Sequence, residues 1–160
     1  MNISTQRIDH IDRVRTAYIM LRDIPLATLS EEYSSINGDS DWVIRPIWEN
    51  CEKAKNLGLF VDIAGIDLSL HQDEYVRRGV PSFIKQRVIP EGRSDLPVLL
   101  KNIGLDENDL FEVLCRSHGI CSMDDNYVSR TPDKVVDVNA MYEQYDIPDF
   151  DTSSYGWINR

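Results

Sequence analysis

Residues 68–119 read LSLHQDEYVRRGVPSFIKQRVIPEGRSDLPVLLKNIGLDENDLFEVLCRSHG, a series of short segments that each end at a glycine or a proline. Ser69 and Gln72 have the spacing of a capping box at a helix N-terminus. Gly79 stands where the C-terminal cap of that helix would fall. The stretch therefore predicts a first short helix after Leu68, closed by Gly79.

The rest of this stretch repeats the same pattern. Pro81 opens the next segment and Pro90-Glu91-Gly92 breaks it, and residues 95–104 and 106–119 each run from an aspartate to a glycine. Together these segments predict a module of short packed helices. We expect its core to contain the large apolar side chains on the inner sides of those helices, namely Phe83, Leu99, Phe111 and Leu114.

Towards the N-terminus, apolar residues recur at steps of three and four. Ile8, Ile11, Val14, Tyr18 and Leu21 follow this spacing, which predicts one face of an amphipathic helix. No catalytic motif accompanies it.

Three further segments fill the chain between residues 35 and 64. Residues 35–41 are polar and rich in turn formers, so they predict a flexible link. Residues 46–57 predict a second helix, with a proline in its first turn and Gly58 at its end. Residues 59–64 predict a short strand, although a buried helix end reads the same way.

The chain is organised as one globular domain over residues 1–145 and an acidic tail over residues 146–160. Its 160 residues suit a single domain, and an apolar fraction of 42% is sufficient for a core. We expect a mainly α or α+β fold, a compact bundle of short helices with at most a small sheet.

The charge of the chain restricts its partners. The formal net charge is −10, which argues against binding to nucleic acid phosphates or to an anionic membrane surface. An acidic surface suits solubility, a basic protein partner or mimicry of nucleic acid. Residues 120–160 hold eight acids and three bases, so half of the net charge lies in the last quarter of the chain.

The tail combines acids with aromatic side chains. Aromatic residues supply contact energy in interfaces and acids steer a basic partner, so we expect this segment to bind the partner. The alternative is that the tail packs back onto the core of the protein itself. The predicted partner-binding residues are Asp149, Phe150, Asp151, Tyr155 and Trp157.

Three cysteines and no secretory leader predict reduced thiols and a cytoplasmic protein. Cys115, His118 and Cys121 are spaced like metal ligands, but a closed zinc site needs four ligands. A buried Cys115 in a helix is the simpler interpretation, and Cys51 stands alone. We therefore expect no metal.

No motif of nucleophilic catalysis, phosphate binding or dinucleotide binding is present, so no cofactor is expected. His71 and Glu74, one helical turn apart, together with Asp62 near the predicted strand, are the candidate catalytic residues if the protein is an enzyme. A solvated surface is the alternative interpretation of the same residues. The acids between residues 124 and 137 lack the spacing of a calcium loop.

About a third of the chain resembles the N-terminal region of the HipA-type toxin kinases. The chain contains no kinase lobe, and its N-terminal half does not resemble the β-rich beginning of those proteins. The resemblance implies a stand-alone accessory or antitoxin-like domain. The matching residues are Leu68-Ser69-Leu70, Tyr75, Phe83, Val88-Ile89-Pro90-Glu91-Gly92, Gly104, Asp109-Leu110-Phe111-Glu112-Val113-Leu114 and Gly119.

These observations predict a non-enzymatic, acidic, intracellular binding protein. Inhibitors of a basic macromolecule, such as immunity proteins, antitoxins or nucleic acid mimics, are the classes that its composition favours. A small enzyme with a dispersed His and carboxylate site is one alternative. A structural or assembly subunit, in a homo-oligomer, is the other.

Overall fold

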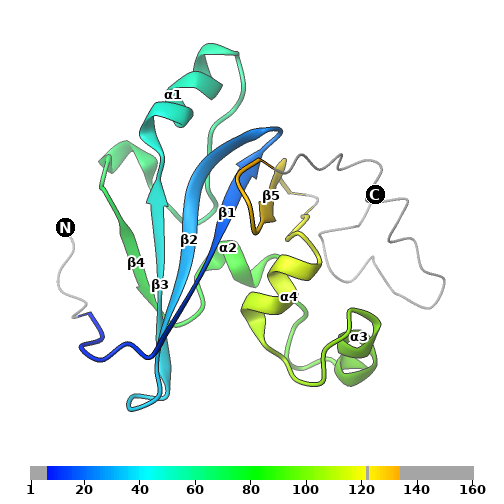
Figure 1. Ribbon diagram of the computed structural model, residues 1–160. Helices are drawn as coiled ribbons and strands as arrows, with labels where there is room; N and C mark the ends of the chain where they lie inside the picture. Colours follow the sequence, from blue (N-terminus) through cyan, green and yellow to red (C-terminus); the bar gives the residue numbers. More distant parts are fainter. Residues whose placement is uncertain (1–6, 122, 134–160) are drawn as a thin grey trace.

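The protein is built on one five-stranded antiparallel sheet. A computed structural model describes residues 7–121 and 123–133, where the strands lie in the order β4-β3-β2-β1-β5 (Figure 1). The prediction of a helical bundle with at most a small sheet is therefore wrong. The strands are β1 (Arg13–Leu21), β2 (Ile24–Ser34), β3 (Asp39–Pro46), β4 (Tyr75–Arg78) and β5 (Asn126–Ser129).

Strand β1 occupies the segment predicted as the first helix. Ala17 and Ile19 are fully buried on one face of the sheet, whereas Val14 of the predicted helical face is 55% exposed. Met20 and Leu21 are also buried, so apolar residues follow one another at the end of the strand. Such a run contains apolar residues at three- and four-residue steps as well as at alternate positions, so the spacing alone misled the prediction.

Tight turns join the first three strands into consecutive hairpins. Arg22 lies between β1 and β2 with a positive φ of 56°. Between β2 and β3, the Gly38 N–H donates to the Ser34 carbonyl at 2.8 Å. The flexible link predicted over residues 35–41 is thus a turn of residues 35–38 followed by the first residues of β3.

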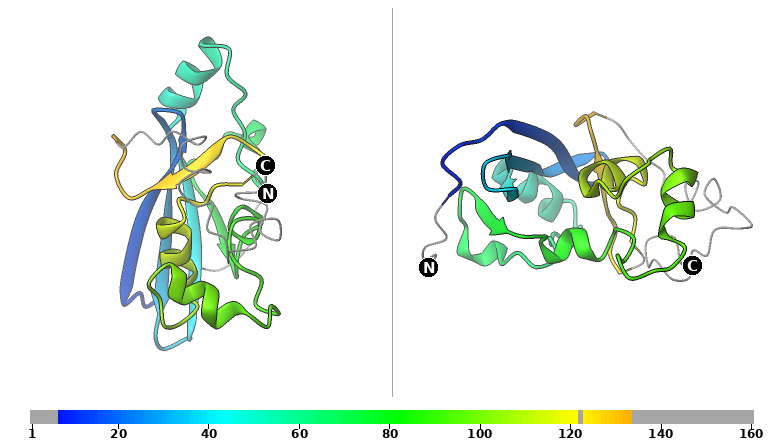
Figure 2. Two further views of the ribbon diagram at one scale, coloured as in Figure 1. Left: turned by 90° about the vertical axis from the view of Figure 1, so that its right-hand side faces the viewer. Right: turned by 90° about the horizontal axis from the view of Figure 1, so that it is seen from below.

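Within the described residues, four short α-helices and one 3-10 helix accompany the sheet (Figure 2). Three predicted helices are confirmed: helices form within residues 95–104 and within residues 106–119, and the helix predicted over residues 46–57 forms from residue 48. The helices are α1 (Trp48–Asn56), the 3-10 helix η1 (Leu68–Leu70), α2 (Ser82–Lys85), α3 (Leu96–Asn102) and α4 (Leu110–Arg116).

Two other local predictions are wrong. Residues 69–79 do not form one helix: Asp67 caps the single turn η1 by accepting from the Ser69 N–H at 3.0 Å, and β4 follows. Gly79 ends that strand. The strand predicted over residues 59–64 is an extended loop with one bridge between Ile63 and Ile66.

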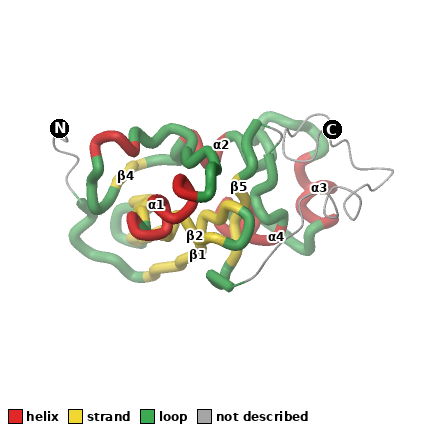
Figure 3. Tube along the Cα trace, turned by 90° about the horizontal axis from the view of Figure 1, so that it is seen from above, coloured by secondary structure: helices red, strands yellow, loops and turns green. Residues whose placement is uncertain are grey.

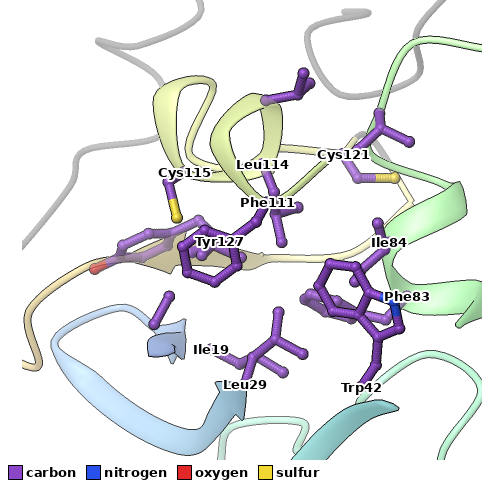
Figure 4. Packing of buried hydrophobic residues seen from close by; sticks show 14 of the residues in the cluster. Ile19, Leu29, Trp42, Phe83, Ile84, Phe111, Leu114, Cys115, Cys121 and Tyr127 are labelled. Atoms are coloured by element: carbon purple, nitrogen blue, oxygen red, sulfur yellow. The ribbon is translucent and has the colours of Figure 1, made fainter. Parts of the chain in front are cut away.

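The main core lies between one face of the sheet and helices α2, α3 and α4. Ile19, Leu29 and Trp42 project from the strands towards the helices (Figure 4). The predicted core is confirmed, since all four of its members are at most 2% exposed and belong to this cluster. These members are Phe83, Leu99, Phe111 and Leu114.

Helix α1 covers a smaller core at the end of the sheet near the turn between β1 and β2. Cys51 and Ala54 of α1 are fully buried against Leu21, Ile24 and Leu26. Figure 3, seen from above, shows α1 over the ends of the central strands, with α3 and α4 on the β5 side. The loop that follows α1 therefore starts at this end of the sheet and leads towards α2.

No helix within residues 7–121 and 123–133 is both long and apolar enough to cross a membrane. The predicted boundary between a domain of residues 1–145 and a tail of residues 146–160 lies outside the described residues.

Candidate binding site

A cavity of about 430 Å³ lies at the β5 end of the sheet, where segments distant in the sequence meet. One wall comes from the loop after α1, a second from the residues that lead into β5, and the floor from the ends of β1 and α2. None of the described residues that line it is basic. The lining residues are Leu21, Phe60, Asp62, Ala64, Gln86, Met123, Asp124, Asp125 and Asn126.

Buried isoleucines hold the first wall, the loop after α1, in place. Ile63 and Ile66 are buried in the core and bridge to each other, so Asp62 and Phe60 point outwards. Gly65 lies in the turn between Ile63 and Ile66 with a φ of 79°. A Cβ on Gly65 would approach the Ser82 Cβ to 2.9 Å. Glycine is therefore required for this wall to pack against α2.

The second wall is held from below by a buried arginine. The Arg87 Nη2 donates to both carboxylate oxygens of Asp124 at 2.5 Å, and the Arg87 side chain has no exposed surface. The Asn126 N–H also donates to the Asp124 Oδ1 at 3.0 Å. These bonds use both oxygens of Asp124 and fix the loop that leads into β5.

A hydrogen bond also joins the two walls directly. The Asn126 side-chain amide donates to the Asp62 carbonyl at 2.7 Å. Because Asn126 is itself buried as the first residue of β5, the distance between the walls is set by the sheet and not by the loops. The cavity is therefore a preformed feature of the fold.

Arg87 reaches Asp124 through a narrow passage. Its guanidinium carbon lies 3.9 Å from the centroid of the Phe83 ring, and its Cδ would lie 3.4 Å from a Cβ placed on Gly119. Gly119 also has a positive φ of 56°, so a larger residue there would be strained as well as crowded. The glycine that ends the α4 segment thus makes room for this arginine.

Burial of Arg87 is incompletely compensated. Its Nε and Nη1 atoms are buried without a hydrogen-bond partner among the described residues, and so is the Gln86 Oε1 on the cavity floor. Unpaired buried polar atoms cost free energy, which the paired carboxylate and the aromatic ring only partly offset. The fold therefore tolerates a local cost in order to place Asp124 and Gln86 at the cavity.

Two large apolar side chains stand at the edge of the cavity. Phe60 is 82% exposed and Met123 is 75% exposed, the two highest values among the exposed large apolar residues of the described chain. Exposed apolar groups beside a polar cavity are typical of surfaces that bind another molecule. The arrangement can hold a ligand that has both an apolar and a positively charged part.

The three candidate catalytic residues take separate roles. His71 stacks on Trp48 with the ring centroids 3.8 Å apart, and Glu74 pairs with Arg7 and Arg45 at 3.0 and 3.1 Å. Asp62 lines the cavity. Within the described residues, no hydrogen bond or ion pair links any two of these three side chains.

The spaced cysteines and histidine serve the core and β5. Cys115 and Cys121 are buried free thiols, and burial raises the pKa of the Cys115 thiol to about 11. The His118 Nδ1 lies 3.0 Å from the Val128 carbonyl, and the Val128 N–H donates to the His118 carbonyl. Within the described residues, no three His, Cys, Asp or Glu side chains are gathered as metal ligands.

Cys51 is also a buried free thiol, and burial raises its pKa. The predicted partner-binding residues of the tail lie outside the described residues. They are Asp149, Phe150, Asp151, Tyr155 and Trp157.

A second hollow, of about 490 Å³, lies over the polar end of the helix-covered sheet face. Both of its arginines are paired with acids: Arg15 donates to Glu31 at 2.5 Å and to Asp109 at 2.8 Å, and Arg13 lies 3.4 Å from Glu31. Burial would raise the pKa of Asp109, but the hydrogen bonds from Arg15 and from the Glu112 N–H outweigh it and lower this pKa. The hollow also contains the Asn108 Oδ1, which is buried without a hydrogen-bond partner among the described residues.

The sequence indicates Asp62 as a candidate residue and contains a group of acids after residue 123, but no pattern in it predicts that the two meet. Phe60 lies within the strand predicted over residues 59–64. No local pattern indicates that residues 60–64 and 123–126 face each other, since the contact depends on β5 pairing with β1. The one available signal was the density of acids itself.

The comparisons with known proteins give no further guide: no family model matches the chain, and no curated protein or solved structure matches it significantly.

Proposed function

We propose that the protein is an acidic, cytoplasmic binding protein that neutralises a basic protein partner, and that the cavity is part of its binding surface. One observation supports this proposal: carboxylates and exposed apolar side chains lie together around one preformed cavity. The carboxylates of Asp62 and Asp125 have no hydrogen-bond or ion-pair partner among the described residues, and Phe60 and Met123 line the same cavity.

Two properties of the whole chain support the proposal. The net charge of −10 attracts a cationic partner over a distance of several ångströms and disfavours nucleic acid as a direct ligand. The three cysteines are free and buried, as is usual in a reducing compartment. Inhibitors of the immunity or antitoxin type, and mimics of nucleic acid, use such surfaces against basic proteins.

The test is site-specific cross-linking from the cavity edge. A photoreactive benzoylphenylalanine replaces Phe60, and cross-linked proteins are identified in the cells that make the protein. We expect basic proteins, with cross-linking that falls when Asp62→Asn and Asp125→Asn are added. The matched control, Glu91→Gln with Asp106→Asn, changes the net charge equally but lies outside the cavity and should leave cross-linking unchanged.

Two results would contradict the proposal. Cross-linking to acidic or neutral proteins would exclude a basic partner. Cross-linking that both double variants reduce equally would mean that the overall charge acts and that the cavity does not.

A further inference from the structure

The Asp62 and Asp125 carboxylates of the cavity are hydrogen-bond acceptors that have no partner among the described residues. Gln86 adds a buried acceptor without a partner among these residues, its Oε1, and its side-chain amide also offers a donor, Nε2. Asp124 already accepts from Arg87, and Asn126 donates to the Asp62 carbonyl. A molecule that satisfies the two carboxylates must therefore supply donors and positive charge.

The apolar edge adds a second requirement. Phe60 and Met123 are exposed beside the acceptors, so the bound group needs an apolar stem as well as a donor head. Arginine and lysine side chains have this construction, with methylene stems that cover apolar surface. A cavity of about 430 Å³ also falls in the size range of sites that take small groups.

We propose that the cavity holds one arginine side chain of the basic partner, an inference that rests on the proposed function. The acceptors come from three separate segments, at Asp62, Gln86 and Asp125. A guanidinium offers five donors in one plane and can reach acceptors on several sides, whereas an ammonium is compact and strongly hydrated. The guanidinium also stacks on an aromatic ring, which Phe60 provides.

The interior of the same protein contains a comparable arrangement. Arg87 stacks on Phe83 at 3.9 Å and donates to the Asp124 carboxylate at 2.5 Å. The proposed site repeats these components at the surface, with Phe60 as the ring and Asp62 and Asp125 as the carboxylates. The partner's arginine would thus bind above the layer formed by the protein's own arginine.

The test is a nuclear magnetic resonance titration of the full chain with the acetylated and amidated tripeptide leucyl-arginyl-leucine. We expect shifts at the amides of Phe60, Asp62 and residues 123–126. The same peptide with citrulline, a neutral analogue of the same shape, should bind about tenfold more weakly or worse, because the charge-assisted hydrogen bonds are lost. The lysine peptide should also bind more weakly.

Two double variants test whether the arginine peptide binds at the cavity. Asp62→Asn with Asp125→Asn should weaken binding of the arginine peptide about tenfold, whereas Glu91→Gln with Asp106→Asn should leave it unchanged. Equal binding of the citrulline peptide, or of the lysine peptide, would overturn the assignment of arginine. Tighter binding to an Arg160→Gln chain than to the wild type would show that the protein's own last residue occupies the cavity, and would overturn the assignment to a partner.

The two proposals fail in different ways. If the arginine peptide does not bind while photo-crosslinking from position 60 still captures a basic protein in a manner that needs Asp62 and Asp125, the arginine assignment is wrong and the proposed function stands. If the peptide binds as expected but no basic protein is cross-linked, the cavity recognises arginine and the proposed function is wrong.

Discussion

On the sheet face away from α2, α3 and α4, three arginines and three acids form a connected network, whereas at the cavity two of three carboxylates have no partner within the part of the chain that the structure describes. In the network, Asp41 is fully buried and accepts from Arg78 at 2.6 Å and from Arg7 at 3.1 Å. Arg7 also pairs with Glu32 and Glu74, and Arg45 pairs with the same two acids. The ion pairs join Arg7, Arg45 and Arg78 to Glu32, Asp41 and Glu74.

The difference separates charges that hold the fold from charges that are available to another molecule. The network ties the segment around Arg7 and Ile8 to β3, since the Ile8 N–H also donates to Asp41 at 3.0 Å. At the cavity, the carboxylates of Asp62 and Asp125 contact no hydrogen-bond or ion-pair partner among the described residues. Substitutions in the network should therefore change stability, and substitutions at the cavity should change binding.

The largest expected effect comes from the main core between the sheet and helices α2, α3 and α4. Phe111 is 1% exposed and packs between α4 and the sheet, and Arg15 lies over its ring at 4.8 Å. Phe111→Ala should lower the free energy of unfolding by roughly 3–5 kcal/mol, because it removes a buried ring and leaves a cavity. Urea denaturation followed by circular dichroism measures this change. A melting temperature lowered by only one or two degrees would contradict the packing.

The next effect concerns the network. Asp41→Asn should lower the free energy of unfolding by about 2–3 kcal/mol, less than for a wholly buried pair because Arg7 and Arg78 are each partly exposed. Asp39→Asn, two residues earlier in β3 and exposed, is the matched control and should change stability little. Equal effects of the two variants would show that the network does not hold the fold.

The same network predicts a dependence on pH. Burial would raise the pKa of Asp41, but hydrogen bonds from Arg78, the Ile8 N–H and Arg7 outweigh it and lower this pKa below 3.8. A lowered pKa in the folded state means that ionised Asp41 stabilises the fold above about pH 4, and that this contribution is lost as the pH falls through the folded pKa. The stabilities of the wild type and of Asp41→Asn should therefore converge in acid.

The helices were more predictable than the sheet because their signals are local. Asp109 caps α4 by accepting from the Glu112 N–H, and Gly104 and Gly119 adopt positive φ where the sequence predicted helix ends. The sheet depends on pairing between distant residues, such as Ile19 with Val128. Asn37-Gly38 was the local hairpin signal between β2 and β3, but the prediction assigned it to a flexible link.

The candidate site was predictable only in its chemistry. The high density of acids can be seen in the sequence, and it predicts a basic partner. The position of the site depends on Arg87 reaching Asp124 and on Asn126 reaching the Asp62 carbonyl. These contacts join residues 37 and 64 positions apart, and no spacing rule connects them.

An intermediate effect is expected from the acidic tail. Deleting residues 146–160 should leave the fold intact and weaken association with the basic partner by more than tenfold, or ~1.4 kcal/mol, because aromatic anchors and steering charges are lost. Neutralising Asp149 and Asp151 should mainly slow association and reduce its dependence on salt. A truncated chain that melts far lower would instead support packing of Trp157 on the protein's own core, and unchanged affinity would exclude the tail from binding.

The smallest effect on stability is expected at the cavity, and it completes the comparison with the network. Asp62→Asn with Asp125→Asn removes two exposed carboxylates that have no partner among the described residues, so no favourable contact is lost. The free energy of unfolding should change by less than about 0.5 kcal/mol, as for the control pair Glu91→Gln and Asp106→Asn.

Both double variants remove two acids from a chain of net charge −10, which slightly reduces the repulsion between like charges. Any stabilisation from this effect is common to both variants, so it cancels when their free energies of unfolding are compared. Urea denaturation of both at neutral pH gives that difference directly. A loss above about 1 kcal/mol confined to the cavity variant would mean that Asp62 or Asp125 stabilises the fold, and the distinction between the two regions would no longer hold. Unchanged stability together with lost arginine binding is the combination that only a binding cavity produces.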